Sequence, residues 1–145
     1  MPMSFNLSTK IKFRVRFNEA DPLGIVWHGN YLKYFEDGRE SFGEQYNLGY
    51  LDIHGKGYVV PIVNINCNFK KSLKFGESGI IETTFINSAA AKIIFEYKIY
   101  KHDSLELIAE GTTTQVFLDS KTNELQLCVP DFFEEWKIKS GIANK

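Results

Sequence analysis

One long amphipathic helix among strand-like segments limits the fold of this chain more than any other feature. Between positions 28 and 46, aromatic residues and glycine recur at spacings of three and four, and charged residues fall between them. The positions in this series are Tyr31, Tyr34, Phe35, Gly38, Phe42 and Tyr46. Such a period predicts an amphipathic helix over about Asn30–Tyr46, with Asn30 as its N-cap.

The segments on either side of this helix carry strand patterns. Apolar and basic residues alternate from Ile11 to Phe17, which predicts a strand with one buried face. After Gly57 the chain is rich in β-branched and aromatic residues, with turn residues between the runs. The strands predicted there are Tyr58–Phe69, Ile80–Ile86, Lys92–Tyr100 and Leu107–Leu118, followed by a short helical turn near Pro130–Ile138.

A strand, a helix and four further strands define an α+β architecture with a largely antiparallel sheet, in one domain spanning residues 1–145. A helix about 27 Å long cannot cover both faces of a five-stranded sheet. The opposite face must therefore meet water or another subunit, and its apolar content favours a subunit. Gly38 and Gly43 each cost the helix about 0.5–1 kcal/mol relative to Ala, which predicts close packing against another backbone.

Composition excludes several classes of protein. With 43% hydrophobic and 24% charged residues, the chain is typical of a globular domain. Its formal net charge of −1 gives no reason to expect binding to nucleic acid or to an anionic membrane. No apolar run reaches the ~18–20 residues of a membrane span, and the N-terminus lacks a signal-peptide pattern. Cys67 and Cys128 have no metal-ligand spacing, so we expect a cytoplasmic protein with reduced thiols and no bound metal.

The segment between the first strand and the helix is dense in residue types that carry chemistry. Asp21 lies in a loop marked by Pro22 and Gly24, and His28 follows seven residues later near the helix start. The first amides of a helix have no internal partners and lie at the positive end of its dipole, so they can hold an oxyanion. A carboxylate aimed at the same point can attack a carbonyl or activate water. The pattern indicates acyl transfer or hydrolysis.

The same residues resemble the signature of the 4-hydroxybenzoyl-CoA thioesterase family of hotdog-fold enzymes. The similarity runs over Ala20–Tyr31: a loop aspartate, a glycine, an apolar pair, an aromatic residue, a His or Tyr, and a Tyr that opens the long helix. The order of elements is similar over nearly the whole chain, as is the strand at Pro61–Val63. The resemblance implies a hotdog fold, in which a five-stranded antiparallel sheet wraps one long helix. It also implies an acyl-CoA thioesterase that needs no cofactor, since the CoA thioester is its substrate.

Roles for single residues follow from the resemblance. Asp21 matches the catalytic carboxylate, which acts as nucleophile or general base on the thioester. His28 matches the position whose backbone N–H polarises the thioester carbonyl. Gly24 would let the loop pass close to the substrate, and Tyr31 would pack near the acyl pocket. The other residues that the resemblance assigns to substrate binding are Val26, Trp27 and Asn30.

The resemblance implies an assembly as well, because the sites of the family lie between subunits. We therefore expect a homodimer or homotetramer, with two sheets joined edge to edge. CoA phosphates are expected to meet lysines at the protein surface. The candidates are Lys70, Lys71, Lys74 and Lys92. In the turn Ser88–Lys92, relatives often carry an Arg or another polar residue, whereas three alanines stand here.

Other interpretations stay open. Asp21 precedes Pro22, where an aspartate can be only a turn residue. Glu36 and Glu40 lie on the helix, where another hotdog branch has its carboxylate. A thioesterase acting on acyl-carrier protein is an alternative, since Lys70–Lys74 holds three lysines that could dock such a partner. A non-catalytic module that binds acyl-CoA is a third possibility, although it would have no need of the loop acid.

Overall fold

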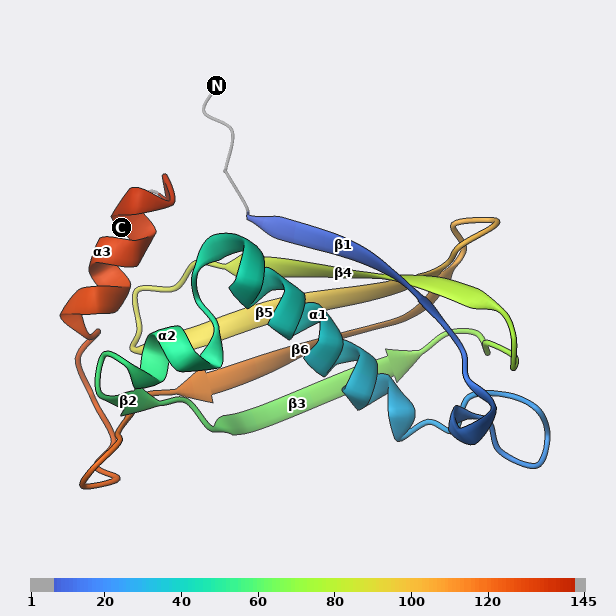
Figure 1. Ribbon diagram of the computed structural model, residues 1–145, viewed down its shortest axis with the longest axis horizontal. Helices are drawn as coiled ribbons and strands as arrows, with labels where there is room; N and C mark the ends of the chain where they lie inside the picture. The colour runs from blue at the N-terminus through green and yellow to red at the C-terminus, as the bar shows by residue number, and fades with distance from the viewer. Residues whose placement is uncertain (1–6, 143–145) are drawn as a thin grey trace.

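A five-stranded antiparallel sheet wraps around one long helix in the computed structural model, which describes residues 7–142 (Figure 1). The order of strands across the sheet is β1-β4-β5-β6-β3. Their bounds are β1 (Ser8–Arg14), β3 (Ile62–Phe69), β4 (Ser78–Ile86), β5 (Lys92–Lys101) and β6 (Leu107–Val116). A separate two-stranded sheet pairs β2 (Tyr58–Val59) with β7 (Leu118–Asp119).

The long helix α1 spans Asn30–Tyr46, so its predicted bounds are confirmed. A single 3-10 turn at Phe17–Glu19 precedes it, and two shorter helices follow: α2 (Tyr50–His54) and α3 (Asp131–Lys139). The predicted short turn near residue 130 is α3, whereas α2 was not predicted. Among the described residues, no helix is long and apolar enough to cross a membrane.

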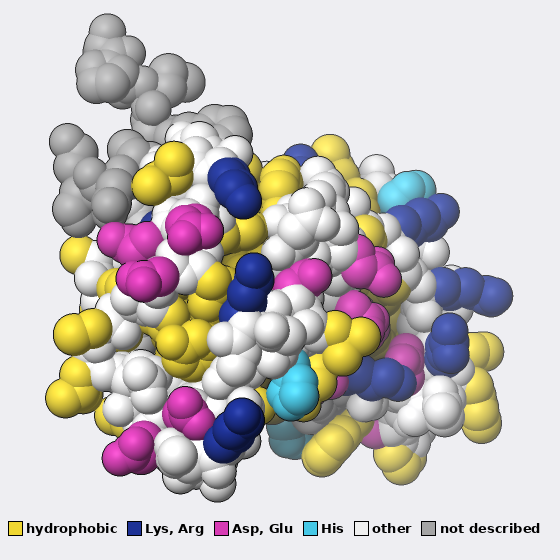
Figure 2. Space-filling view, turned by 60° about the vertical axis from the view of Figure 1, so that its left-hand side comes forward, with side chains coloured by type: hydrophobic (Ala, Val, Ile, Leu, Met, Phe, Trp, Pro, Cys, Tyr) yellow, Lys and Arg dark blue, Asp and Glu magenta, His cyan; other side chains and the backbone are white. Residues whose placement is uncertain are grey.

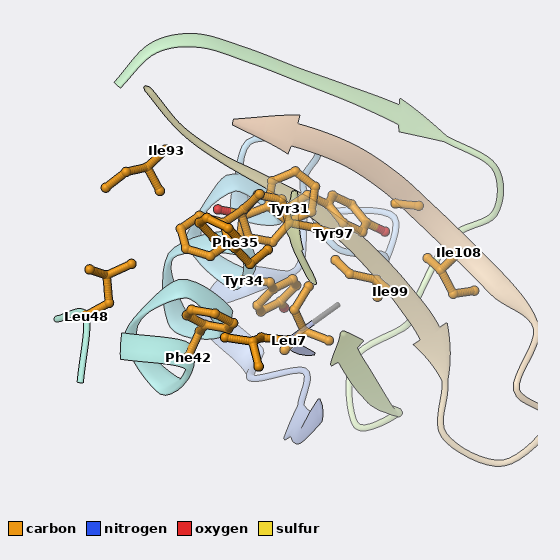
Figure 3. Close-up of a cluster of buried hydrophobic side chains, with 14 of the residues drawn as sticks. Leu7, Tyr31, Tyr34, Phe35, Phe42, Leu48, Ile93, Tyr97, Ile99 and Ile108 are labelled. Carbon is orange, nitrogen blue, oxygen red and sulfur yellow. The ribbon is translucent and has the colours of Figure 1, made fainter. Parts of the chain in front are cut away.

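The apolar face of α1 packs against the sheet and forms part of the core. Tyr31, Tyr34 and Phe35 are buried on this face, as is Phe42 further along. Phe35 stacks on Tyr97 of β5 with 4.4 Å between ring centroids, and Figure 3 shows these side chains meeting between helix and sheet. The opposite face of α1 is charged, as the helical period predicts.

Both helix glycines lie where a Cβ would collide, but the predicted packing against another backbone is confirmed only for Gly43, because Gly38 lies against side chains of β4. A Cβ on Gly38 would lie 2.9 Å from a carbon of Ile81 in β4, and a Cβ on Gly43 would lie 2.7 Å from the Cα of Gly49. The helix therefore approaches the sheet and its own return loop closely. The chain turns back because Asn47, the C-cap, adopts a left-handed conformation with φ of 59°.

Three features of the strand prediction are wrong. Phe17, predicted on the buried face of the first strand, lies in the 3-10 turn with 78% of its surface exposed. The predicted strand over residues 58–69 is divided at Val60–Pro61, because proline has no N–H for the ladder. The predicted strand over residues 107–118 is divided as well, at Phe117, into β6 and β7.

Strand β3 forms one free edge of the sheet and exposes apolar side chains. Val63 is 58% exposed, Ile65 is 43% exposed and Phe69 is 52% exposed. The alternation of this strand predicts that Val63, Ile65 and Cys67 share a buried face. Of these three residues, only Cys67 is half-buried. An apolar face beside unpaired backbone groups is typical of a strand that pairs with another chain.

Candidate active site

The loop that carries Asp21 folds back like a short hairpin and leads directly into α1. The Asp21 N–H donates to the carbonyl of Ile25 at 2.8 Å. Gly24 has a φ of +81°, which an L side chain rarely adopts. The connection between β3 and β4 holds the loop from the other side, because the Phe75 N–H donates to the Gly24 carbonyl at 3.0 Å. Backbone hydrogen bonds therefore fix the loop on both sides.

The carboxylate of Asp21 is held by its own loop. Its Oδ1 accepts hydrogen bonds from the N–H of Leu23 at 2.9 Å and the N–H of Ile25 at 3.4 Å. This is the turn role that an aspartate before proline suggests. Within residues 7–142 no donor contacts Oδ2. The turn thus orients the carboxylate and leaves one oxygen available to act as nucleophile or base.

Helix α1 begins without a side-chain cap. Its N-cap residue is Gly29, so the predicted N-cap role of Asn30 is wrong. The Asn30 amide instead donates from Nδ2 to the carbonyl of Glu19 at 2.9 Å. In the part of the chain that the structure describes, the N–H groups of His28 and Gly29 have no acceptor. At the positive end of a helix, such free donors can hold a developing negative charge.

Among the described residues, no hydrogen bond joins Asp21 directly to His28. The link between them runs through the hairpin, where the carbonyl of Glu19 accepts the N–H of Trp27 at 3.0 Å. Glu19 is two residues before Asp21, and Trp27 is one residue before His28. The distance between the loop carboxylate and the helix amide is therefore set by this part of the backbone.

Glu19 itself is buried, which the sequence analysis did not foresee. Only 5% of this residue is exposed, and its Oε1 accepts from the hydroxyl of Tyr34 and from the N–H of Arg16, both at 2.9 Å. Lys33 lies 3.3 Å from Oε2. Burial by itself raises the pKa of this carboxyl, but the three donors together hold the pKa below its ordinary value.

Aromatic side chains surround the helix start. The ring of His28 lies 5.0 Å from that of Trp27 and 6.2 Å from that of Phe69. Phe69 also packs edge-on against Tyr31, with 5.2 Å between centroids. The sequence did not predict that Phe69 lies at the site, because the pattern of a strand does not show which loop lies at the end of that strand. The His28 ring is exposed at this surface.

The residues predicted to bind substrate divide into exposed and buried ones. Trp27 is 52% exposed, whereas Val26 is 4% exposed and belongs to the core. Tyr31 is also buried, and its burial raises the pKa of its hydroxyl. Of these three side chains, only Trp27 is open to a ligand in the isolated chain.

Three of the predicted lysines lie beside the Asp21 loop. Lys74 forms a backbone β-bridge with Ile25 of that loop, and Lys70 and Lys71 precede Lys74 in the sequence. Lys70 and Lys71 are occupied by carboxylates on β6 and its turn, with Lys70–Glu110 at 3.6 Å and Lys71–Glu106 at 3.0 Å. Lys74 makes no salt bridge with any described residue. Figure 2 shows Lys and Arg side chains gathered toward the right-hand side of its view.

Lys92 lies at the opposite end of the sheet. It pairs with Val116 at one end of β6, whereas Phe69, next to Lys70, pairs with Ala109 at the other end. Seven residues of strand separate the two places, or about 23 Å. Within one subunit, Lys92 and Lys70 therefore do not form one cluster.

A cavity lies away from Asp21, between α1, α2 and the beginning of β3. Its volume is about 910 Å³. Apolar residues such as Leu48, Val60 and Ile62 line it together with Glu36 and Glu40 of the helix. The two helix carboxylates kept as alternatives thus face a cavity, whereas Asp21 and His28 do not line it. Figure 2 brings this end of the molecule forward and shows hydrophobic side chains exposed between acidic ones.

Within residues 7–142, no three His, Cys, Asp or Glu side chains cluster in a way that could hold a metal ion. Both cysteines are free thiols. Cys67 is half-buried, and burial raises the pKa of its thiol, which disfavours the thiolate that a nucleophile needs.

The fold and the Asp21 loop define the class of protein. The chain belongs to the thioesterase-like superfamily, which matches it over residues 15–137, and its fold is the predicted hotdog fold. In sequence it is similar to the Bacillus subtilis protein named "Putative acyl-CoA thioesterase YneP", with 32% identity over 79% of this chain and 82% of that protein. It is 25% identical to the acyl-acyl carrier protein thioesterase ATL3 of Arabidopsis thaliana, over 81% of this chain and 62% of that one.

Two solved structures show the same fold. The DHNA-CoA thioesterase of Staphylococcus aureus has a TM-score of 0.79 and 23% identity, over 92% of this chain and 91% of that one. A 4-hydroxybenzoyl-CoA thioesterase has a TM-score of 0.76 and 20% identity, over 89% of this chain and 97% of that one. That structure is of an aspartate-to-asparagine variant complexed with 4-hydroxybenzoyl-CoA.

Proposed function

We propose that this protein hydrolyses acyl-CoA thioesters to a free acid and CoA, with Asp21 as nucleophile or general base. The observation that carries the proposal is the state of the Asp21 carboxylate. One of its oxygens is fixed by the N–H groups of Leu23 and Ile25, and the other has no donor among the described residues. An ionised carboxylate held in this way needs little reorganisation before it attacks a carbonyl or takes a proton from water.

The start of α1 supplies the second part of the mechanism. As the thioester carbonyl is attacked, negative charge develops on its oxygen. The N–H of His28 points from the uncapped end of the helix, where a donor and the helix dipole both favour that charge. The charge then returns to re-form a carbonyl as the C–S bond breaks. If Asp21 acts as general base, the proton that it took from water passes to the CoA thiolate and the free acid is formed directly. If Asp21 is the nucleophile, the product is an acyl anhydride on Asp21, which water hydrolyses to the free acid while the thiolate takes a proton from that water.

We infer that a second subunit completes the site. Strand β3 begins at the 910 Å³ cavity and ends at Phe69, next to the Asp21 loop. A two-fold axis that pairs β3 with its copy must run the two strands antiparallel. The cavity of one subunit then lies toward the Asp21 loop of its partner, and the exposed apolar residues of β3 are covered. In this arrangement the cavity receives the acyl group.

A thioesterase acting on acyl-carrier protein is the second candidate. The similarity to the Arabidopsis enzyme favours it, as does Lys74, which is exposed beside the Asp21 loop without a salt bridge among the described residues. An acidic carrier protein would bind to a positive charge at this place.

One assay tests both candidates. Thiol release is measured across a panel of acyl-CoAs, with one acyl-carrier protein substrate included, for the wild type and Asp21→Asn. The proposal expects acyl-CoA hydrolysis that Asp21→Asn abolishes. Hydrolysis of the carrier substrate alone would favour the second candidate, and no release from any thioester would refute both.

A further inference from the structure

The buried carboxylate of Glu19 lies at the junction of the three segments that form the candidate site. Its Oε1 accepts from Arg16 at the end of the first strand segment and from Tyr34 on the second turn of α1. Its Oε2 lies 3.3 Å from the ammonium of Lys33. Both oxygens are therefore used, and the residue is 5% exposed.

The backbone of the same residue holds the beginning of the helix. The Glu19 carbonyl accepts from the N–H of Trp27 at 3.0 Å and from the side-chain amide of Asn30 at 2.9 Å. Glu19 thus makes six polar contacts: three through its carboxylate, two through its carbonyl, and one through its N–H, which donates to the Arg16 carbonyl at 3.0 Å. These contacts tie the two strands of the hairpin to each other and to the helix.

We propose that Glu19 is a positioning residue, which holds the Asp21 carboxylate and the His28 N–H at the separation that thioester hydrolysis needs. The inference rests on the proposed function of Asp21. No hydrogen bond joins Asp21 to His28 among the described residues. The hairpin links them through two backbone rungs, Asp21 to Ile25 and Trp27 to Glu19, and the Glu19 rung is the one next to His28. A small change in this rung moves the two groups relative to each other, and a displacement of about 1 Å in such a pair can cost about 100-fold in rate.

A carboxylate suits this task because it accepts from two donors fixed beside it, Arg16 and Tyr34, while the half-exposed Lys33 balances its charge. The Tyr34 hydroxyl is in the buried core, and the Arg16 N–H faces the same oxygen. In Glu19→Gln one oxygen is replaced by an NH₂ group that cannot accept, so at least one donor loses its partner. The negative charge is lost as well, so the hydrogen bonds from Arg16 and Tyr34 become weaker neutral bonds and the local arrangement relaxes.

The test compares Glu19→Gln with a matched glutamate of the sheet. Glu82 on β4 also accepts from a tyrosine hydroxyl, that of Tyr100 at 3.3 Å, and lies 4.0 Å from a lysine, Lys10. It does not contact the Asp21 loop. We expect Glu19→Gln to lower kcat by about 10–100-fold with KM within about twofold, since the lost interaction affects orientation more than binding. Glu82→Gln is expected to keep both constants.

A second readout does not depend on activity. Hydrogen exchange of the Trp27 amide, which donates to Glu19, is expected to become faster in Glu19→Gln and to stay unchanged in Glu82→Gln. A wild type without thioesterase activity refutes the function proposed for Asp21, while exchange at Trp27 still decides whether Glu19 holds the loop. Unchanged kcat and unchanged exchange in Glu19→Gln overturn the inference, and so does a loss of rate that only matches the unfolded fraction.

If Glu19→Gln fails to fold, Tyr34→Phe decides the question. It keeps the ring that stacks on Phe13 at 4.2 Å and removes only the hydroxyl. A lower kcat with an unchanged KM supports the inference, and a wild-type kcat overturns it. Tyr100→Phe is its control.

Discussion

The two ends of the sheet are held by different interactions. At the loop end, which comprises residues 15–28 and 70–77, hydrogen bonds fix the backbone while large apolar side chains stay open to solvent: Phe17 is 78% exposed and Leu23 is 82% exposed. At the aromatic end, α3 packs its rings on the sheet. Phe133 stacks on Trp136 with 5.6 Å between centroids, and both are buried. The loop end positions reactive groups, and the aromatic end stabilises the fold by burying apolar side chains.

Stability and chemistry are therefore separated in the molecule. Polar contacts such as those of Asp21 fix directions but contribute little net free energy, about 0.5–1.5 kcal/mol each. Burying a large aromatic side chain contributes several times more. Variants at the loop end should therefore lower the rate, whereas variants at the aromatic end should lower the stability.

The largest expected effect is on the rate, at the loop end. Asp21→Asn keeps the size of the side chain and its turn oxygen but removes the charge. Loss of a general base costs about 10²–10⁴-fold in rate, so kcat should fall by that amount while KM changes little. The melting temperature should stay near that of the wild type. A variant that folds and hydrolyses its best acyl-CoA at the wild-type kcat would contradict the mechanism and direct attention to Glu36 and Glu40.

At the aromatic end we expect a loss of stability without a loss of rate. Phe133→Ala removes a fully buried ring that contacts Phe117 and Trp136 and should lower the free energy of unfolding by about 3–5 kcal/mol. Denaturant titration measures the loss. Among the molecules that remain folded, kcat should be unchanged, and a kcat that falls with stability would show that the two ends are coupled.

A smaller effect is expected from the His28 ring. His28→Ala keeps the backbone N–H that is proposed to stabilise the oxyanion, so kcat should fall by less than the loss in Asp21→Asn. The ring is exposed and contacts Trp27, so its removal changes packing at the surface only. A loss as large as that of Asp21→Asn would assign the chemistry to the imidazole.

Substitution of the lysines should affect KM, and the effect should be smaller than those above. An exposed charge pair is worth about 0.2–1 kcal/mol, so Lys74→Ala should raise KM for acyl-CoA by up to about fivefold, and less at high salt. Lys92→Ala, at the far end of the subunit, should change KM less. The triple variant of Lys70, Lys71 and Lys92 should also raise KM with little change in kcat. An unchanged KM in all three would place the nucleotide elsewhere.

The smallest expected effect concerns acid stability. The donors around Glu19 hold its pKa below the ordinary value of 4.5, so the folded state binds this proton less readily than the unfolded chain does. Its stabilisation is present above pH 4.5 and is lost as the pH falls through the folded pKa. Glu19→Gln should lack this part of the acid dependence, which thermal melts between neutral and acid pH can measure.

Local patterns in the sequence predicted the bounds of α1 well because its aromatic period is long and its C-terminal end follows a local rule, although the cap at its start was assigned to the wrong residue. The edge position of β3 could not be predicted, since alternation in Val63 and Ile65 does not reveal whether a neighbouring strand covers them. The separation of Lys92 from Lys70 depends on strand order, which no local pattern contains. Glu19 was missed for a similar reason: a carboxylate in a loop resembles a solvated one until its distant partner, Tyr34, is known.

The tryptophans give each end of the molecule its own optical reporter. The chain has two of them: Trp27 at the loop end, 52% exposed, and Trp136 at the aromatic end, 8% exposed. An exposed indole emits at longer wavelength than a buried one, so the emission spectrum is the sum of two overlapping bands, a red one from Trp27 and a blue one from Trp136. A ligand that reaches the helix start should quench the red band first, whereas unfolding of the aromatic end should shift the blue one. Binding and stability can thus be followed in one cuvette, without a label.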